Sequence, residues 1–71
     1  MSTIQQLDNT MKYFEFLHLP TELQKVSKPF AELADKIYQR AYERKANQHE
    51  SLIAIRKLLE AKDCAVRASI V

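Results

Sequence analysis

The 71-residue sequence contains no glycine, no tryptophan, a single cysteine and only two prolines. Without glycine, the chain cannot form the glycine-rich phosphate-binding loops of the Walker or dinucleotide type. The one cysteine, Cys64, excludes a disulfide within the chain and is poor material for a metal site. We therefore expect a cytoplasmic protein, in a reducing compartment, with no metal and no cofactor.

Long apolar runs and a strong charge of one sign are also missing. No apolar run approaches the roughly 20 residues that span a bilayer, and no signal peptide is recognisable, so no membrane association is expected. Lys and Arg number 11 against 9 acidic residues, a formal net charge of +2. This bias is too small for a duplex-binding surface, so nucleic acid is not an expected partner, although a few converging cations would suffice for a small anion.

The residues that are present favour a folded helical chain, with a hydrophobic fraction of 46%. A chain of this length buries only a small core. With no disulfide or metal to hold it together, oligomerisation is the remaining route to stability. We expect one domain, residues 1–71, that forms a homo-oligomer.

An N-terminal helix is predicted over about residues 3–17. Ser2 and Gln5 have the spacing of a capping box at its start. Its apolar residues step by three, four and three and form one seam: Ile4, Leu7, Met11 and Phe14. Pro20 pushes the residue before it out of the helical region, so the helix must end ahead of that point.

The next segment is predicted to hold helical structure interrupted near Pro29. Thr21 has the character of an N-cap for a short helical turn over residues 22–26. Ser27 can cap a new helix in whose first turn Pro29 fits, so a kink or a restart is expected there, with a single kinked helix as the alternative. From Phe30 to Ala41 the apolar residues follow one helical stripe.

A long helix is predicted over residues 50–70, capped by Asn47. Its apolar residues fall into an inner stripe of Leu52, Ile55, Leu59 and Val66, and an outer stripe of Ala54, Leu58, Ala61, Ala65 and Ala68. The inner stripe should pack within the chain, and the outer stripe against a neighbouring subunit. The predicted fold is all-α, a short N-terminal helix plus an antiparallel helical hairpin, assembling into a symmetric helical oligomer.

Catalytic chemistry has little to build on in this sequence. A nucleophile and a base would have to come from Cys64 with His18 or His49. Cys64 lies within the last predicted helix, where a small packing residue is ordinary, and neither histidine belongs to a metal-ligand spacing. We therefore expect no enzymatic activity.

One group of basic residues recurs at helical spacing. Lys36, Arg40 and Arg44 are four residues apart and would share one outer helix face. Such a face is either simply solvated or the contact surface of a small regulatory module that binds a protein partner or DNA.

Two further cations lie on the last predicted helix. Lys62 falls between Leu59 and Val66 on the inner stripe, so it either extends its charge to the surface or meets an anionic partner from the protein or from a ligand. Arg67 is within i, i+4 reach of Asp63, with which it could form a surface ion pair. If the outer stripe meets another subunit, Lys62 and Arg67 are the charges that would face a pocket between subunits.

Three of the aromatic residues lie within four positions: Tyr13, Phe14 and Phe16. They lead into His18 and into two turns that carry Lys25, Ser27 and Lys28. Aromatic faces stack on nucleobases, and lysines with backbone donors at a helix start hold phosphates. The cluster is therefore either core packing or the wall of a small nucleotide pocket.

Three stretches carry a likeness to a known family. Residues 13–21 read YFEFLHLPT, residues 30–37 read FAELADKI, and residues 50–61 with 65–70 form an alanine-rich closing segment. They resemble the small viral helical-hairpin proteins that sequester cyclic nucleotide signals of bacterial immunity, the anti-CBASS and anti-Thoeris sponges. The first stretch is similar to the family's aromatic lead into a His-x-Pro-Thr turn, and the others to its two hairpin helices.

The resemblance implies a phage protein that binds a messenger without cleaving it. Family members are compact oligomers, hexamers in the best-known case, that hold cyclic dinucleotides, cyclic trinucleotides or cyclic ADP-ribose relatives in pockets between protomers. They thereby block antiphage signalling in the host cytoplasm. By analogy Phe16, or Tyr13 in its place, would stack on a base and Lys28 would meet phosphate. The chain departs from the family pattern at Leu17, in residues 26–29 and in the hairpin turn, which fits a different messenger.

Overall fold

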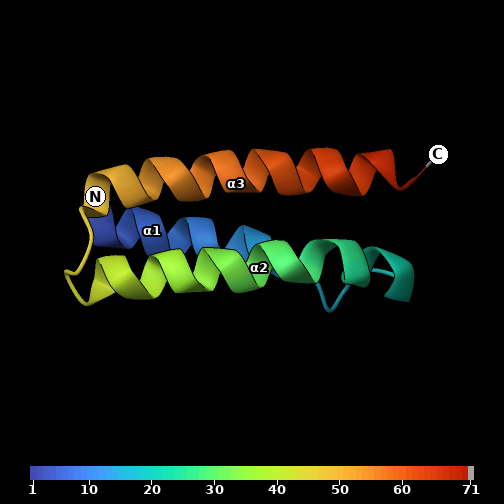
Figure 1. The fold of residues 1–71 in the computed structure, drawn as a ribbon, viewed down its shortest axis with the longest axis horizontal. Coiled ribbons are helices and arrows are strands. Elements are labelled where there is room, and N and C mark those ends of the chain that lie inside the picture. Colours follow the sequence, from blue (N-terminus) through green and yellow to red (C-terminus); the bar gives the residue numbers. More distant parts are fainter. Residues whose placement is uncertain (71) are drawn as a thin grey trace.

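Three α-helices and one short 3-10 helix make up the computed structural model, which describes residues 1–70. α1 spans Thr3–Met11, η1 continues it over Lys12–Phe14, α2 spans Thr21–Tyr42 and α3 spans Gln48–Ala68. No strand occurs within residues 1–70. α2 and α3 lie side by side in opposite directions, and α1 runs parallel to α3 beside the half of the hairpin that contains its turn (Figure 1). The predicted all-α fold, a short helix and an antiparallel hairpin, is confirmed.

The core lies where all three helices meet. Leu7 and Phe14, seven residues apart on α1 and η1, are buried there with Leu52 and Ile55 of α3. α2 contributes small buried residues at seven-residue spacing: Ser27, Ala34 and Ala41. Small side chains let the neighbouring helices approach closely, and apolar residues at three- and four-residue steps interlock as in helical bundles.

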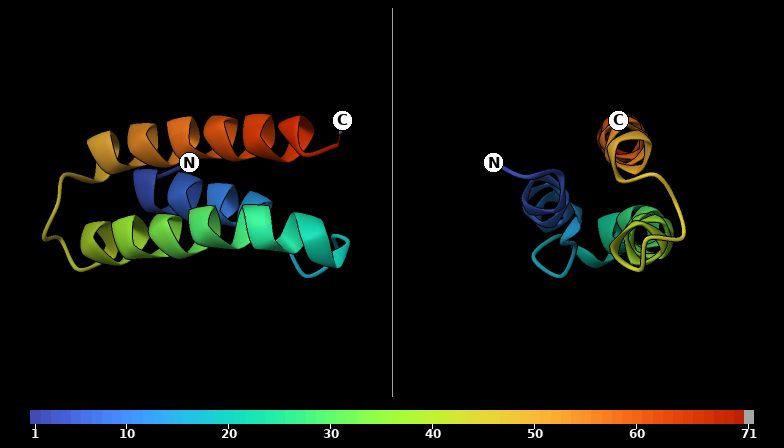
Figure 2. Two further views of the ribbon diagram at one scale, coloured as in Figure 1. Left: turned by 45° about the vertical axis from the view of Figure 1, so that its right-hand side comes forward. Right: turned by 90° about the vertical axis from the view of Figure 1, so that its left-hand side faces the viewer.

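Beyond Phe14 the hairpin of α2 and α3 is no longer covered by the first helix. α1 and η1 accompany only the first part of α3 (Figure 2), and the buried residues of α3 all lie in that part: Ser51, Leu52 and Ile55. Leu59 and Val66, further along the inner stripe, are half-buried. In the outer stripe Ala54, Ala61 and Ala68 are exposed, and Leu58 and Ala65 are half-buried. The length of the first helix therefore decides where the core stops.

The N-terminal helix ends at Phe14 and not at Leu17 as the sequence predicts. Glu15 leaves the helix with φ −58° and ψ 138°. In a longer α-helix the Tyr13 carbonyl would accept the N–H of Leu17. That carbonyl instead accepts a hydrogen bond from Nζ of Lys62 on α3, at 3.0 Å. A contact between helices thus takes the place of the next helical hydrogen bond, and Leu17 is left 80% exposed.

α2 is continuous through Pro29, so the predicted restart at Ser27 is wrong. Pro29 lacks the N–H that would pair with the carbonyl of Lys25. Both residues are exposed, so water can satisfy that carbonyl, while Ser27 is fully buried. The helix begins one residue differently from the prediction, with Pro20 in the capping position that the pattern assigns to Thr21.

The turn between α2 and α3 is closed by two backbone hydrogen bonds. The N–H of Arg44 donates to the Ala41 carbonyl at 3.1 Å, and that of Lys45 to the Arg40 carbonyl at 2.8 Å, which is the Schellman pattern. This pattern needs a left-handed residue, usually glycine, and in a chain without glycine Arg44 adopts it with φ 60°. The Asn47 side chain then caps α3 by accepting a backbone N–H of its first turn, as predicted.

A hydrogen bond joins α1 to α2, from the Tyr38 hydroxyl to Oδ1 of Asp8. The Tyr38 ring also stacks on Tyr42, with ring centroids 6.0 Å apart and planes at 26°. The bond to Asp8, together with burial and the charge of the carboxylate, raises the pKa of Tyr38 to about 12. The hydroxyl donates only while it keeps its proton, so the contact between α1 and α2 depends on a protonated phenol.

Tyr38→Phe removes this bond and should lower the free energy of unfolding by about 1 kcal/mol at pH 8, a typical net value for one hydrogen bond. The folded-state pKa of about 12 lies above the ordinary 10.0, so the contribution is complete below pH 10 and is lost between pH 10 and 12. Urea unfolding followed by circular dichroism measures the difference between the two proteins, which should vanish at the higher pH. Tyr42→Phe, which leaves the bond to Asp8 in place, is the control, and a difference that persists unchanged contradicts this assignment.

Candidate functional site

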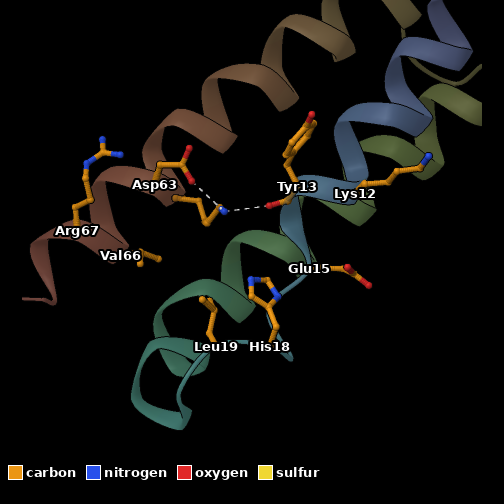
Figure 3. A pocket seen from close by; sticks show the side chains of 9 residues that line it. Lys12, Tyr13, Glu15, His18, Leu19, Asp63, Val66 and Arg67 are labelled. Atoms are coloured by element: carbon orange, nitrogen blue, oxygen red, sulfur yellow. Dashed lines mark hydrogen bonds and ion pairs between the residues drawn. The ribbon is translucent and has the colours of Figure 1, made fainter.

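A cavity of about 380 Å³ opens where the first helix ends and the hairpin continues. It is lined by Lys12, Tyr13 and Glu15 from η1 and the residue after it, by His18 and Leu19 from the loop, and by Lys62, Asp63, Val66 and Arg67 from α3 (Figure 3). Four of the residues predicted from the sequence therefore meet here, namely Tyr13, His18, Lys62 and Arg67. These residues come from segments far apart in the sequence. They meet because α1 and α3 run in the same direction, which places the end of the first helix beside Lys62 of α3.

Lys62 forms the inner wall of the cavity. Its side chain is only 12% exposed, and its Nζ lies 3.0 Å from Oδ1 of Asp63. The same Nζ donates to the Tyr13 carbonyl at 3.0 Å (Figure 3). Of the alternatives that the sequence leaves open for Lys62, the structure shows a partner from the protein itself. A cation near the carbonyl end of a helix is also favoured by the helix dipole.

The predicted pair of Asp63 with Arg67 does not form within residues 1–70, because Asp63 binds Lys62. The Arg67 guanidinium instead donates to Sγ of Cys64 at 3.3 Å, a weak and uncharged acceptor. Lys12 also takes part in none of the ion pairs of the described residues. Two cations at this cavity therefore have no acidic partner within residues 1–70.

Tyr13 and His18 supply the aromatic ring and the imidazole of the cavity lining. Tyr13 is 67% exposed, so its ring is accessible to a ligand. In Figure 3 the His18 imidazole lies on the opposite side of the cavity from Asp63, and the Glu15 side chain points away from both. Counting His18 as neutral, the lining carries three cations and two carboxylates.

Four other predicted residues lie elsewhere. Phe16 is half-buried and lines a separate hollow beside Phe14 and Leu17. Lys25 pairs with Glu22 on the surface at 3.1 Å. Lys28 is exposed on α2 outside the cavity lining, and Ser27 is buried in the core. For Ser27 and Lys28 the reason is the continuity of α2. A helix start at Ser27 would have offered free backbone N–H donors, and a helix interior offers none.

Lys36, Arg40 and Arg44 do not share one helix face. Lys36 and Arg40 are exposed on α2, but Arg44 lies beyond the last residue of that helix, in the left-handed position of the turn. The Arg40 guanidinium reaches the Lys45 carbonyl at 3.4 Å. Arg44 lines a hollow at the hairpin turn with residues of the N-terminus, among them Ser2 and Thr3. The predicted continuous basic stripe is therefore interrupted at its third member.

Sequence reasoning missed Lys12 and Asp63 as parts of the cavity. Lys12 directly precedes the aromatic segment, which was a usable signal. Asp63 was assigned to Arg67 on i, i+4 spacing, and adjacent helical residues such as Lys62 and Asp63 point in different directions, so spacing alone argues against their pairing. In the structure Nζ of Lys62 also donates to the Tyr13 carbonyl, and spacing along α3 cannot indicate this contact with another helix.

Ser27→Ala tests the placement of this predicted ligand residue. The Ser27 hydroxyl is fully buried and is without a hydrogen-bond partner among the described residues. Removing it should raise the free energy of unfolding by about 1 kcal/mol, since an unsatisfied buried polar group is costly and alanine favours a helix. Chemical denaturation measures the change. Ser51→Ala, at a buried serine of α3, is the matched control, and a loss of stability in Ser27→Ala would show that the hydroxyl has a partner.

Within residues 1–70 no helix is long and apolar enough to cross a membrane, and no three metal-ligating side chains come together. The cavity offers Lys62 on its wall, two cations without acidic partners among the described residues, and an accessible aromatic ring. This arrangement can hold an anion that carries a flat ring. Comparisons with protein-family models, with curated proteins and with solved structures found no match for this chain.

Proposed function

We propose that this protein binds and sequesters a cyclic nucleotide second messenger of bacterial immunity, without cleaving it. The observation that carries the proposal is the meeting of Lys12, Tyr13, His18, Lys62 and Arg67 around one cavity. The sequence resemblance to the anti-CBASS and anti-Thoeris sponges supplies the ligand class. In this proposal a phage-encoded protein withdraws the messenger from its effector in the host cytoplasm and so blocks antiphage signalling.

The cations provide the phosphate contacts. Among the described residues Arg67 donates to the Cys64 thiol and pairs with no carboxylate, and its planar guanidinium matches two phosphate oxygens at once. Lys12 adds a second charge at the rim. A cyclic dinucleotide carries two phosphodiester charges, so a few converging cations can offset them.

The aromatic contact falls to Tyr13. In the resembled family an aromatic residue ahead of the His-x-Pro turn stacks on a base, and both Tyr13 and Phe16 match that description. Tyr13 lines the cavity, whereas Phe16 lies in a different hollow. Stacking on such a ring contributes about 1–3 kcal/mol per base and tolerates different bases.

A neighbouring subunit would complete the pocket. The cavity is open to solvent, and its volume of about 380 Å³ is at the lower end of the range for small-molecule sites. The outer stripe of α3 supports such a contact, since its exposed Ala54, Ala61 and Ala68 permit close approach of another helix. The resemblance favours a hexamer.

Native mass spectrometry with a panel of cyclic dinucleotides, cyclic trinucleotides and cyclic ADP-ribose isomers tests the proposal. The expected result is one discrete oligomer that gains the mass of an intact ligand. At about a hundredfold excess over Kd, ligand linkage should also raise Tm by roughly 10 °C or more. AMP and the linear dinucleotides are the controls. Recovery of a hydrolysed product, or no binding across the panel, contradicts the proposal.

Ala61→Trp tests the oligomer separately. Ala61 is exposed in the outer stripe, so tryptophan should leave the protomer folded and prevent the close approach of a second α3. Light scattering after size exclusion should then report a smaller assembly. Glu60→Trp, on a different side of the same helix turn, should leave the assembly unchanged. If Ala61→Trp retains the parent mass, the outer stripe is not the contact.

A further inference from the structure

The ion pair between Lys62 and Asp63 joins two consecutive residues of one helix. Such neighbours point about 100° apart around the helix axis and do not ordinarily meet. Here Nζ of Lys62 and Oδ1 of Asp63 are 3.0 Å apart, with the lysine side chain 12% exposed and the aspartate side chain 46% exposed. The lysine is thus held inside the cavity, and the aspartate reaches in from the rim.

The lysine keeps an unused hydrogen-bond donor. An ammonium group has three donors, and those of Lys62 supply the Tyr13 carbonyl and the Asp63 carboxylate. No other acceptor is bonded to Nζ within residues 1–70. The lysine lines the cavity, so its third donor is available to an acceptor there, either water or an anionic oxygen of a ligand.

The two acceptors of Lys62, the Tyr13 carbonyl and the Asp63 carboxylate, differ in how freely they can move. The Tyr13 carbonyl belongs to the backbone at the end of the first helix and is held by the buried ring of Phe14. The Asp63 carboxylate sits on a half-exposed side chain, with Arg67 available one turn along the helix at i, i+4 spacing. Asp63 can therefore leave Lys62 without disturbing the backbone, and the Tyr13 carbonyl cannot.

We propose that Asp63 is an internal competitor for the ligand, and that it sets the affinity of the cavity for anions through Lys62. In the free protein the Asp63 carboxylate is ion-paired with the Lys62 ammonium. On binding, Lys62 keeps the Tyr13 carbonyl and exchanges the carboxylate of Asp63 for a phosphate oxygen. This inference rests on the proposed function, because it assigns a phosphate contact within the same cavity.

The exchange gives the cavity a selectivity for charge. A ligand with one weakly basic anionic oxygen gains little, since it replaces a carboxylate that Lys62 already binds. A ligand with two phosphate charges gains from Lys62 and also from Arg67 and Lys12, which have no acidic partner among the described residues. Asp63 is thus a specificity-determining residue that excludes singly charged metabolites and admits molecules with two phosphates.

The exchange is tested with inorganic pyrophosphate, titrated into the full-length protein and followed by amide chemical shifts. Asp63→Asn should tighten binding about fivefold, because the ligand no longer has to displace a carboxylate from the solvent-screened ion pair with Lys62, and such pairs are worth up to about that factor. Glu60→Gln is the matched control, since it removes one exposed negative charge from the same helix outside the cavity, and it should change Kd by less than about twofold.

A double-mutant cycle separates exchange at Lys62 from general repulsion. Lys62→Gln keeps an amide donor for the Tyr13 carbonyl and removes the charge, so the fold should persist, as circular dichroism can check. In that background the fivefold gain from Asp63→Asn should fall to the level of Glu60→Gln. If the gain is the same with and without Lys62, or if Asp63→Asn equals Glu60→Gln in the parent protein, the exchange is refuted.

The same variants distinguish this inference from the proposed function. If cyclic nucleotides fail to bind but the pyrophosphate cycle behaves as described, the messenger assignment falls and the exchange stands. If a cyclic nucleotide binds and Asp63→Asn leaves its Kd unchanged, the exchange falls and the sponge assignment stands. Lys62→Met, in which an apolar side chain joins Leu59 and Val66, keeps the test available should Lys62→Gln fail to fold.

Discussion

The Lys62 ammonium donates to the Tyr13 carbonyl at the point where a longer first helix would have used that carbonyl itself. The helix stops at Phe14, and the chain turns away through residues 15–20. The first helix, α1 with η1, is thus shorter than the hairpin of α2 and α3 that it covers. The core, the cavity and the uncovered part of α3 all follow from that difference in length.

The packing of α2 explains how so short a helix can still be held. Its small residues at seven-residue spacing let α1 and α3 approach, so that Leu7 and Ile55 become completely buried. Pro29 does not interrupt this face, because the backbone bond that it removes lies on the exposed side of the helix. Ser27 contributes small size to the packing, and its hydroxyl is without a partner among the described residues.

The ion pair at the cavity is not the one that i, i+4 spacing predicts. Asp63 pairs with Lys62 and not with Arg67, whose guanidinium donates to the Cys64 thiol. The result is a cavity whose most buried cation, Lys62, is paired with a half-exposed carboxylate, while Lys12 and Arg67 take part in no ion pair among the described residues. This arrangement is the basis of the anion binding proposed above.

The sequence by itself determined the features whose causes are local. The start of α1 at a Ser2–Gln5 capping box, the start of α3 at Asn47 and the all-α hairpin follow from neighbouring residues, and the structure has all of them. The anomalous position of Lys62 on an apolar stripe was also visible, and it pointed to the cavity. The tertiary structure alone decided the end of the first helix, the burial of Ser27 and the choice of Lys62 over Arg67 as the partner of Asp63. The physical reason is the same in each case: the hydrogen-bond acceptor or the packing partner comes from a helix far away in the sequence, and spacing along one helix cannot indicate which distant groups will be brought beside it.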